Sequence, residues 1–134
     1  MQWLVKSEPV KYGWDSFVRD GSTVWDGVRN NQAALYLRAM RIGEELLFYH
    51  SNEGLAVVGI ARVSGEHFID PSDPKARFPA VMLEPVRALA RPVTLAAMKA
   101  EPALAGMAMF RQFRLSVVPI TPEEWRVIVG MGAA

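Results

Sequence analysis

Hydrophobic residues are grouped along this sequence in short runs, and several runs have the two-residue alternation that is typical of β-strands. The predicted strands are residues 2–7, 45–51, 55–68 and 80–86, and a last strand that begins at about residue 115. Within 45–51, one face would carry Leu46, Phe48 and His50, and the other Leu47, Tyr49 and Ser51. Gly59 and Gly65 interrupt the longest run, which indicates a bend or a close approach of another segment. Pro85 places its strand at a sheet edge or at a β-bulge.

Helical periodicity appears in four shorter segments. The predicted helices are residues 14–19, residues 31–41, a short helix after Thr94 and a last helix after Thr121. Ala33, Leu37 and Met40 would share the buried face of the second of these helices. The last helix has a strong start signal, because the side chains of Thr121 and Glu124 have the spacing of a capping box.

The remaining segments are predicted to be turns and loops. Residues 66–79 are predicted to form a loop, since each proline in "DPSDP" keeps the residue before it out of the helical region. No repeat, low-complexity tract or linker divides the sequence, so one domain over residues 1–134 is expected. Strands separated by short helices and glycine bends indicate an α+β domain with a strongly curved, barrel-like mixed sheet.

Composition and charge narrow the function classes. The 134 residues are 51% hydrophobic and 22% charged, as in ordinary globular domains, and no run of about 18 apolar residues suggests a membrane span. There is no cysteine, and therefore neither a thiol nucleophile nor a thiolate metal site. With a net charge of +1, non-specific phosphate binding should be weak, so any nucleic-acid role would depend on a local pocket. We expect a cytoplasmic protein without membrane attachment.

Catalytic and metal-binding patterns are scarce. The two histidines, His50 and His67, lie in different segments without the spacing of a metal site, and no G-x-S-x-G or G-x-x-x-x-G-K motif occurs. A triad of Ser7, Asp26 and His50 can be drawn, and Glu8 can be considered as a general base, but such sets can be drawn in most sequences. An enzyme, either a hydrolase or a transferase, is therefore the less favoured alternative.

The segment that precedes the helix at 31–41 concentrates groups suited to recognition. Trp25 offers a flat face on which a base can stack, with a contribution of about 1–3 kcal/mol. Gly27 lets a ligand approach the backbone, and the amide of Asn30 can both donate to and accept from a base edge. Each residue also has a structural interpretation: Trp25 as core, Asn30 as a helix N-cap, and Arg29 as a solvated charge.

Three further polar segments admit the same two interpretations. Ser7 and Glu8 can contact a ligand or only turn the chain at a strand end. Arg111 and Arg114 can bind an anion, or one of them can form a structural ion pair with Glu8. Residues 49–51, "YHS", can line a pocket or be a half-buried strand end. Taken singly, none of these segments favours the functional interpretation.

Their combination is more informative. The motifs occur in the order "WLVKSEP", "WDGVRNNQA", "FYHS", "VVGIA", an Asp-Pro-rich loop, "RPVTL" and "RQFRLSVVPITPEEW". This order and spacing resemble the EVE-domain family of the PUA-like superfamily, which includes proteins of the thymocyte nuclear protein 1 type. The resemblance extends from about residue 2 to residue 129.

The resemblance implies a PUA-like curved mixed β-barrel with surrounding short helices, and a reader of a modified nucleobase. Modified cytosine in DNA is the first expectation, and a modified RNA base is the alternative. Neither catalytic activity nor a cofactor is implied. The nuclear relatives carry a basic N-terminal extension that this sequence lacks, so a single-domain cytoplasmic protein is expected. The sequence leaves the oligomeric state open, with a monomer favoured. The residues that match the family's pocket region are Lys6, Ser7, Glu8, Trp25, Val28, Arg29, Asn30, Tyr49, His50, Ser51, Arg111 and Arg114.

We hypothesise that these residues converge on one concave pocket. An extruded or single-stranded base would stack on Trp25, with Tyr49 on its opposite side, and Arg29 with Lys6 would contact the flanking phosphate. Phe113 stands where the family usually has a small residue, and it would either narrow the pocket or turn into the core. The groups expected to read the hydrogen-bonding edge of the base are Asn30, Ser7 and Ser51.

Overall fold

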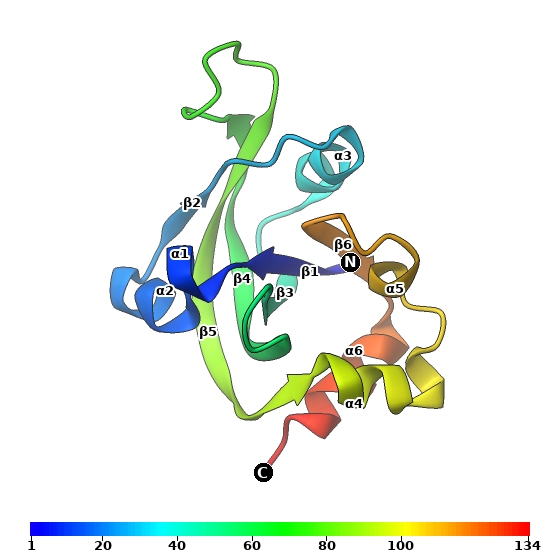
Figure 1. Ribbon diagram of the computed structural model, residues 1–134. Helices are drawn as coiled ribbons and strands as arrows, with labels where there is room; N and C mark the ends of the chain where they lie inside the picture. The colour runs from blue at the N-terminus through cyan, green and yellow to red at the C-terminus, as the bar shows by residue number, and fades with distance from the viewer.

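A six-stranded mixed sheet organises the molecule (Figure 1). The computed structural model describes residues 1–134. The strand order is β2-β5-β4-β3-β1-β6, with β1 and β3 parallel and all other neighbours antiparallel. The predicted α+β fold is confirmed, and its sheet is curled but not closed, since β2 and β6 remain unpaired edges. The strands are β1 (Gln2–Ser7), β2 (Thr23–Trp25), β3 (Glu45–His50), β4 (Ala56–Ile69), β5 (Pro79–Thr94) and β6 (Val117–Ile120).

Short helices surround the sheet. The predicted helices α2, α3, α4 and α6 are all present, and the capping box of α6 is formed by Thr121 and Glu124. Helices α1 and α5 and the 3-10 turn η1 were not predicted, because three or four residues are too few to show a period. No helix is both long and apolar enough to cross a bilayer. The helices are α1 (Pro9–Tyr12), α2 (Trp14–Asp20), α3 (Asn31–Ala39), α4 (Leu95–Ala100), η1 (Pro102–Leu104), α5 (Ala108–Arg111) and α6 (Pro122–Met131).

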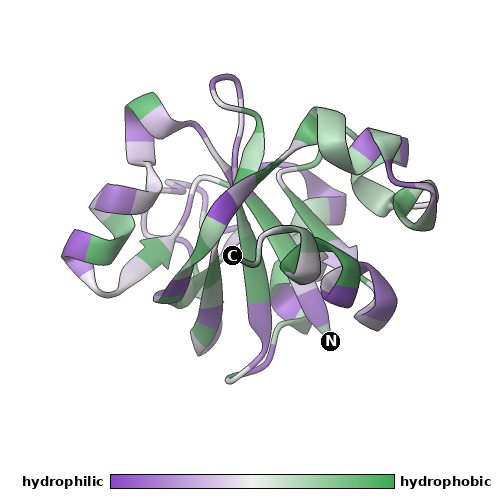
Figure 2. Ribbon diagram, turned by 90° about the horizontal axis from the view of Figure 1, so that it is seen from below, coloured by the Kyte–Doolittle hydropathy of each residue, from purple (hydrophilic) through white to green (hydrophobic).

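Each face of the sheet has its own hydrophobic core. Strand β3 contributes Leu46 and Phe48 to one core and Leu47 and Tyr49 to the other, as its alternation predicts. Helices α2 and α3 cover the first core, and α4, α5 and α6 cover the second. Hydrophobic residues accordingly run through the middle of the sheet, with hydrophilic residues at the strand ends (Figure 2). A site at the strand ends of this sheet therefore has packed side chains on both faces to support it.

The long β4–β5 hairpin differs in extent from the prediction. Strand β4 continues to Ile69, so the connecting loop is 70–78, and β5 runs well beyond the predicted 80–86. Pro85 lies at a bulge, because it pairs with Ala61 of β4 next to a register shift. It also lies just beyond the three residues of β5 that pair with β2. The missing N–H of proline therefore costs no hydrogen bond to β2.

Gly59 is required for packing, as the sequence indicated. A Cβ at this position would lie 2.4 Å from Cη2 of Trp14, whose ring packs edge-on against Phe17 and Phe48. Gly59→Ala is expected to lower the free energy of unfolding by about 1–3 kcal/mol, because the core has no room for the added methyl group. Urea unfolding measures this change. Gly106→Ala is the matched control, since nothing lies within 4 Å of its added Cβ, and an equal effect of both variants would contradict the argument.

Candidate functional site

Two adjacent clefts open where β1 ends. The Trp25 cleft has a volume of about 750 Å³ and is lined by the end of β1, by α1, by residues 22–28, and by Met82 and Ser116. The Tyr49 cleft has a volume of about 460 Å³. Both volumes lie in the range of about 300–1,000 Å³ that is typical of ligand sites. The Tyr49 cleft is lined by Lys6, Glu8, Tyr49, Ser51, Asn52, Leu55, Phe113, Arg114 and Ser116.

Strand pairing explains why distant motifs meet here. Strands β1 and β3 are parallel, which places Lys6 beside Tyr49 and Ser7 beside His50 in the register. Ser116 lies on the other side of β1, where its carbonyl accepts from the Lys6 N–H at 2.9 Å. Lys6, Glu8 and Ser116 line both clefts, so the clefts share a wall. The "KSEP" and "YHS" motifs are thus adjacent, although His50 lines neither cleft.

Trp25 is a core residue that also borders a cleft. Its side chain is only 8% exposed and packs edge-on against Phe17 and Phe48, with ring centroids 6.5 and 5.7 Å away. The part that remains accessible lines the Trp25 cleft beside Val28. Tyr49 belongs to the core on the opposite face of the sheet and lines the other cleft. The two rings therefore do not face each other, and the predicted sandwich of one base between them is wrong.

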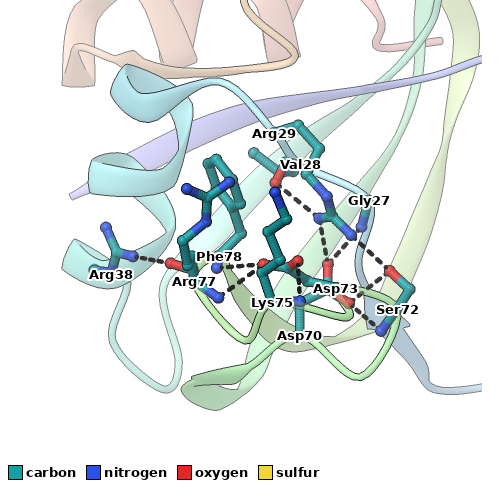
Figure 3. A network of polar contacts seen from close by, with 10 residues as sticks. All are labelled: Gly27, Val28, Arg29, Arg38, Asp70, Ser72, Asp73, Lys75, Arg77 and Phe78. Carbon is teal, nitrogen blue, oxygen red and sulfur yellow. Dashed lines mark hydrogen bonds and ion pairs between the residues drawn. The ribbon is translucent and has the colours of Figure 1, made fainter.

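Arg29 contacts Asp70 (Figure 3). It lines neither cleft. Asp70 is fully buried and accepts from Gly27 N–H at 2.8 Å, from Arg29 Nη1 at 2.9 Å, and from both the N–H and the hydroxyl of Ser72 at 2.7 Å. Burial alone would raise the pKa of Asp70, but the hydrogen bonds from Ser72, Arg29 and Gly27 outweigh it and lower the pKa to about 2. The predicted phosphate contact of Arg29 is therefore replaced by a structural ion pair with a buried carboxylate.

Three other predicted residues also lie outside both clefts. Asn30 caps α3, where its side-chain oxygen accepts from the N–H groups of the second and third helical residues. His50 Nε2 accepts from the Trp14 N–H at 3.1 Å, and burial lowers the pKa of His50 although Asp15 opposes this shift. Arg111 borders a separate depression beside the N-terminus. For Asn30 and His50, the structural interpretation is the one observed.

Glu8 has partners other than the arginines. Its carboxylate accepts from Asn52 Nδ2 at 2.5 Å and pairs with Lys11 Nζ at 3.3 Å. The ion pair considered between Glu8 and Arg111 or Arg114 is absent. The negative charge of Glu8 is thus balanced by Lys11 and by the hydrogen bond from Asn52.

Phe113 narrows a cleft, which was the first of its two expected roles. Its side chain is 52% exposed and lines the Tyr49 cleft. The Lys6 ammonium lies 4.4 Å from the centroid of the Phe113 ring and donates to the Phe113 carbonyl at 2.6 Å. Burial lowers the pKa of the Lys6 ammonium. This lysine therefore belongs to the wall that the two clefts share and contacts the Phe113 ring.

Several lining residues were missed by the sequence analysis. Tyr12 and Lys11 reach the Trp25 cleft because Pro9 begins a helix after the first strand, which a proline at the first helical position could have indicated. Asn52 and Ser116 reach the clefts through turns and long-range pairing, for which the sequence has no local signal. Of the twelve predicted residues, those that line at least one cleft are Lys6, Ser7, Glu8, Trp25, Val28, Tyr49, Ser51 and Arg114.

Comparisons with known proteins agree on one family. Residues 1–131 match the EVE domain. Human thymocyte nuclear protein 1 is 32% identical over an alignment that covers 96% of this chain and 72% of the human protein. The NMR structure of Rpa0253 from Rhodopseudomonas palustris is 48% identical, with a TM-score of 0.92 over 98% of this chain and 92% of that chain. The crystal structure of human THYN1 in complex with 5-methylcytosine-containing DNA is 30% identical, with a TM-score of 0.91 over 99% and 98% of the two chains.

Proposed function

Because the chain belongs to the EVE-domain family, we propose that it binds nucleic acid through a modified base held in the Trp25 cleft. The human relative that was crystallised with DNA containing 5-methylcytosine makes a modified cytosine the first candidate. The bound base would be single-stranded or extruded from a duplex. No cofactor or catalytic step is part of this proposal.

The composition of the Trp25 cleft is the observation that carries the proposal. A nucleobase has flat apolar faces and a polar edge, and the cleft offers both kinds of surface. Its apolar walls come from Trp25, Val28 and Met82, and hydroxyl groups come from Ser7 and Thr23. Burying one methyl group against such a wall contributes about 0.8 kcal/mol, or roughly a fourfold preference for the methylated base. Larger selectivity would require hydrogen bonds to the polar edge.

Single strands are the favoured form of the target. Extruding a base from a duplex costs a few kcal/mol. A chain with a net charge of +1 gains little from phosphate neutralisation to offset that cost. Intact duplexes should therefore bind more weakly than single strands. Competition between matched DNA and RNA strands separates the DNA proposal from the RNA alternative, because a contact to the 2′-hydroxyl would favour RNA.

The side-chain geometry supports a binding role over the hydrolase or transferase alternative. The Ser7 hydroxyl donates to the Tyr12 carbonyl at 2.5 Å, and His50 Nε2 accepts from a backbone N–H. No hydrogen bond links Ser7 to His50, so the nucleophile and base of the conceivable triad are not paired. Turnover that is abolished by Glu8→Ala or His50→Ala, without oligonucleotide binding, would favour the enzyme instead.

Ser7→Ala tests the proposed cleft. We expect a single strand with one 5-methylcytosine to bind more tightly than its cytosine match, and the variant to weaken that binding about two- to tenfold, the effect of one hydrogen bond. Fluorescence anisotropy measures both affinities. Ser64→Ala is the matched control, because Ser64 is exposed on β4 and borders neither cleft. Equal affinities of the two variants, or no preference for any modified base, would contradict the proposal.

A further inference from the structure

A tyrosine whose buried hydroxyl group has no partner is among the residues that line the second cleft. Tyr49 is 1% exposed, and its hydroxyl is the one buried side-chain polar atom of the structure without a hydrogen-bond partner. A buried hydroxyl is strongly disfavoured unless it finds a partner. Tyr49 is also a lining residue of the Tyr49 cleft, so a ligand oxygen that reaches the hydroxyl from this cleft would satisfy it.

The same cleft has uncompensated positive charge. Arg114 lines it without any ion pair, and the Lys6 ammonium contacts only a carbonyl and aromatic rings. The nearby negative charge of Glu8 is held by Lys11 and Asn52. An anion in this cleft would therefore meet two available cations, and a guanidinium is well suited to a phosphate.

An aromatic surface completes the arrangement. Half of the Phe113 side chain is exposed at the border of the cleft. An exposed aromatic ring beside cations is the combination that proteins use to bind single strands, with stacking for the base and charge for the backbone. The Tyr49 cleft is directly adjacent to the Trp25 cleft, because both are lined by Lys6, Glu8 and Ser116.

We propose that the Tyr49 cleft binds the nucleotide adjacent to the one held in the Trp25 cleft, an inference that rests on the proposed function. Arg114 and Lys6 hold the phosphate that links the two nucleotides, and the neighbouring base stacks on Phe113. The Tyr49 hydroxyl donates to a phosphate or sugar oxygen. The ligand is then a strand of at least two nucleotides and not a free nucleoside.

Arg114→Gln tests the phosphate contact. The probes are a single-stranded DNA pentanucleotide with a central 5-methylcytosine, and the same strand with neutral methylphosphonate linkages on each side of that base. The wild type should bind the charged strand about tenfold more tightly than the neutral one, and Arg114→Gln should lose most of this difference. Arg126→Gln removes an exposed charge that borders neither cleft and should keep the difference. An unchanged difference in Arg114→Gln would overturn the proposal.

Tyr49→Phe distinguishes a ligand contact from a structural role. Removing a hydroxyl that has no partner should not lower the melting temperature of the free protein, whereas affinity for the pentanucleotide should fall about three- to tenfold. A lower melting temperature with unchanged affinity would overturn the assignment. Phe113→Ala tests the stacking contact. Replacing the neighbouring base by an abasic site should weaken binding to the wild type but should have little further effect on binding to Phe113→Ala. If the losses of affinity from the variant and from the abasic site simply add, the base does not stack on Phe113.

Failure of this inference is separable from failure of the proposed function. If the wild type prefers 5-methylcytosine but its affinity is insensitive to the adjacent phosphate and base, only the second site is refuted. If the wild type binds no modified strand, both are refuted. Ser7→Ala should weaken charged and neutral strands equally, because Ser7 lines only the Trp25 cleft.

Discussion

Trp25→Ala is expected to lower the free energy of unfolding by about 3–5 kcal/mol, because it removes a large side chain from a packed core. The Trp25 side chain is 8% exposed and contacts the rings of Phe17 and Phe48 edge-on. The cavity left behind would lie against the rings of Phe17 and Phe48 in the core on this face of the sheet. Urea unfolding monitored by far-UV circular dichroism, a signal of the backbone and not of the indole, measures the loss of stability.

Trp25→Phe is the control that separates folding from recognition. Phenylalanine keeps an aromatic ring in the core, so the loss of stability should be smaller than for alanine. It also reduces the aromatic surface that borders the Trp25 cleft, so weaker binding of a 5-methylcytosine strand by a folded Trp25→Phe protein would support stacking. An alanine variant as stable as the wild type would show that the indole is not a core residue. Reduced binding of Trp25→Ala alone would not establish a contact with the base.

Periodic parts of the fold were predictable because their pattern is local. The alternation of β3 assigned Leu46 and Phe48 to one core and Leu47 to the other, and the spacing of Thr121 and Glu124 specified the start of α6. Strand β2 has three residues, too few to show a period. The second half of β5 is mostly exposed, and its extended conformation comes from pairing with β4, so hydropathy could not reveal it.

The candidate site was predictable where strand ends supply the residues, and less so elsewhere. Lys6 and Ser7 end β1 beside Tyr49 at the end of β3, so the parallel pairing of these strands brings the motifs together. Arg29 looked equally available in the sequence, but its partner Asp70 lies 41 positions away in a loop. Whether a polar side chain is free or engaged depends on such distant partners, and no local pattern records them.

The Asp70 network suggests a physical role for that loop. Asp70 joins the β4–β5 hairpin to the segment that lines the Trp25 cleft, because it accepts from both Gly27 N–H and Arg29. Gly27 has a φ of +79°, a conformation that favours glycine and orients this N–H. The buried carboxylate therefore fixes the border of the Trp25 cleft, although neither Asp70 nor Arg29 lines it.

Asp70→Asn is accordingly expected to lower the free energy of unfolding by about 2–3 kcal/mol at neutral pH. Removing one partner of a buried ion pair typically costs about 3–5 kcal/mol, and the 38% exposure of the Arg29 side chain reduces that cost, because water can solvate the charge left behind. The binding of a 5-methylcytosine strand should weaken at the same time, since the Gly27 segment loses its anchor. Urea unfolding and fluorescence anisotropy measure the two effects.

The dependence of this effect on pH identifies the carboxylate as its cause. The pKa of Asp70 is about 2 in the folded protein, compared with 3.8 for an unperturbed aspartate in the unfolded chain. The ionised group therefore stabilises the fold above pH 3.8, and this contribution is lost as the pH falls towards 2. The shift corresponds to about 2 kcal/mol. The difference in stability between the wild type and Asp70→Asn should therefore shrink by about that amount between pH 4 and pH 2. Glu53→Gln, which removes an exposed carboxylate without an ion pair, should retain the pH dependence of the wild type. A constant difference between wild type and Asp70→Asn across this range would mean that the asparagine acts by altered packing and that the charge of Asp70 contributes nothing.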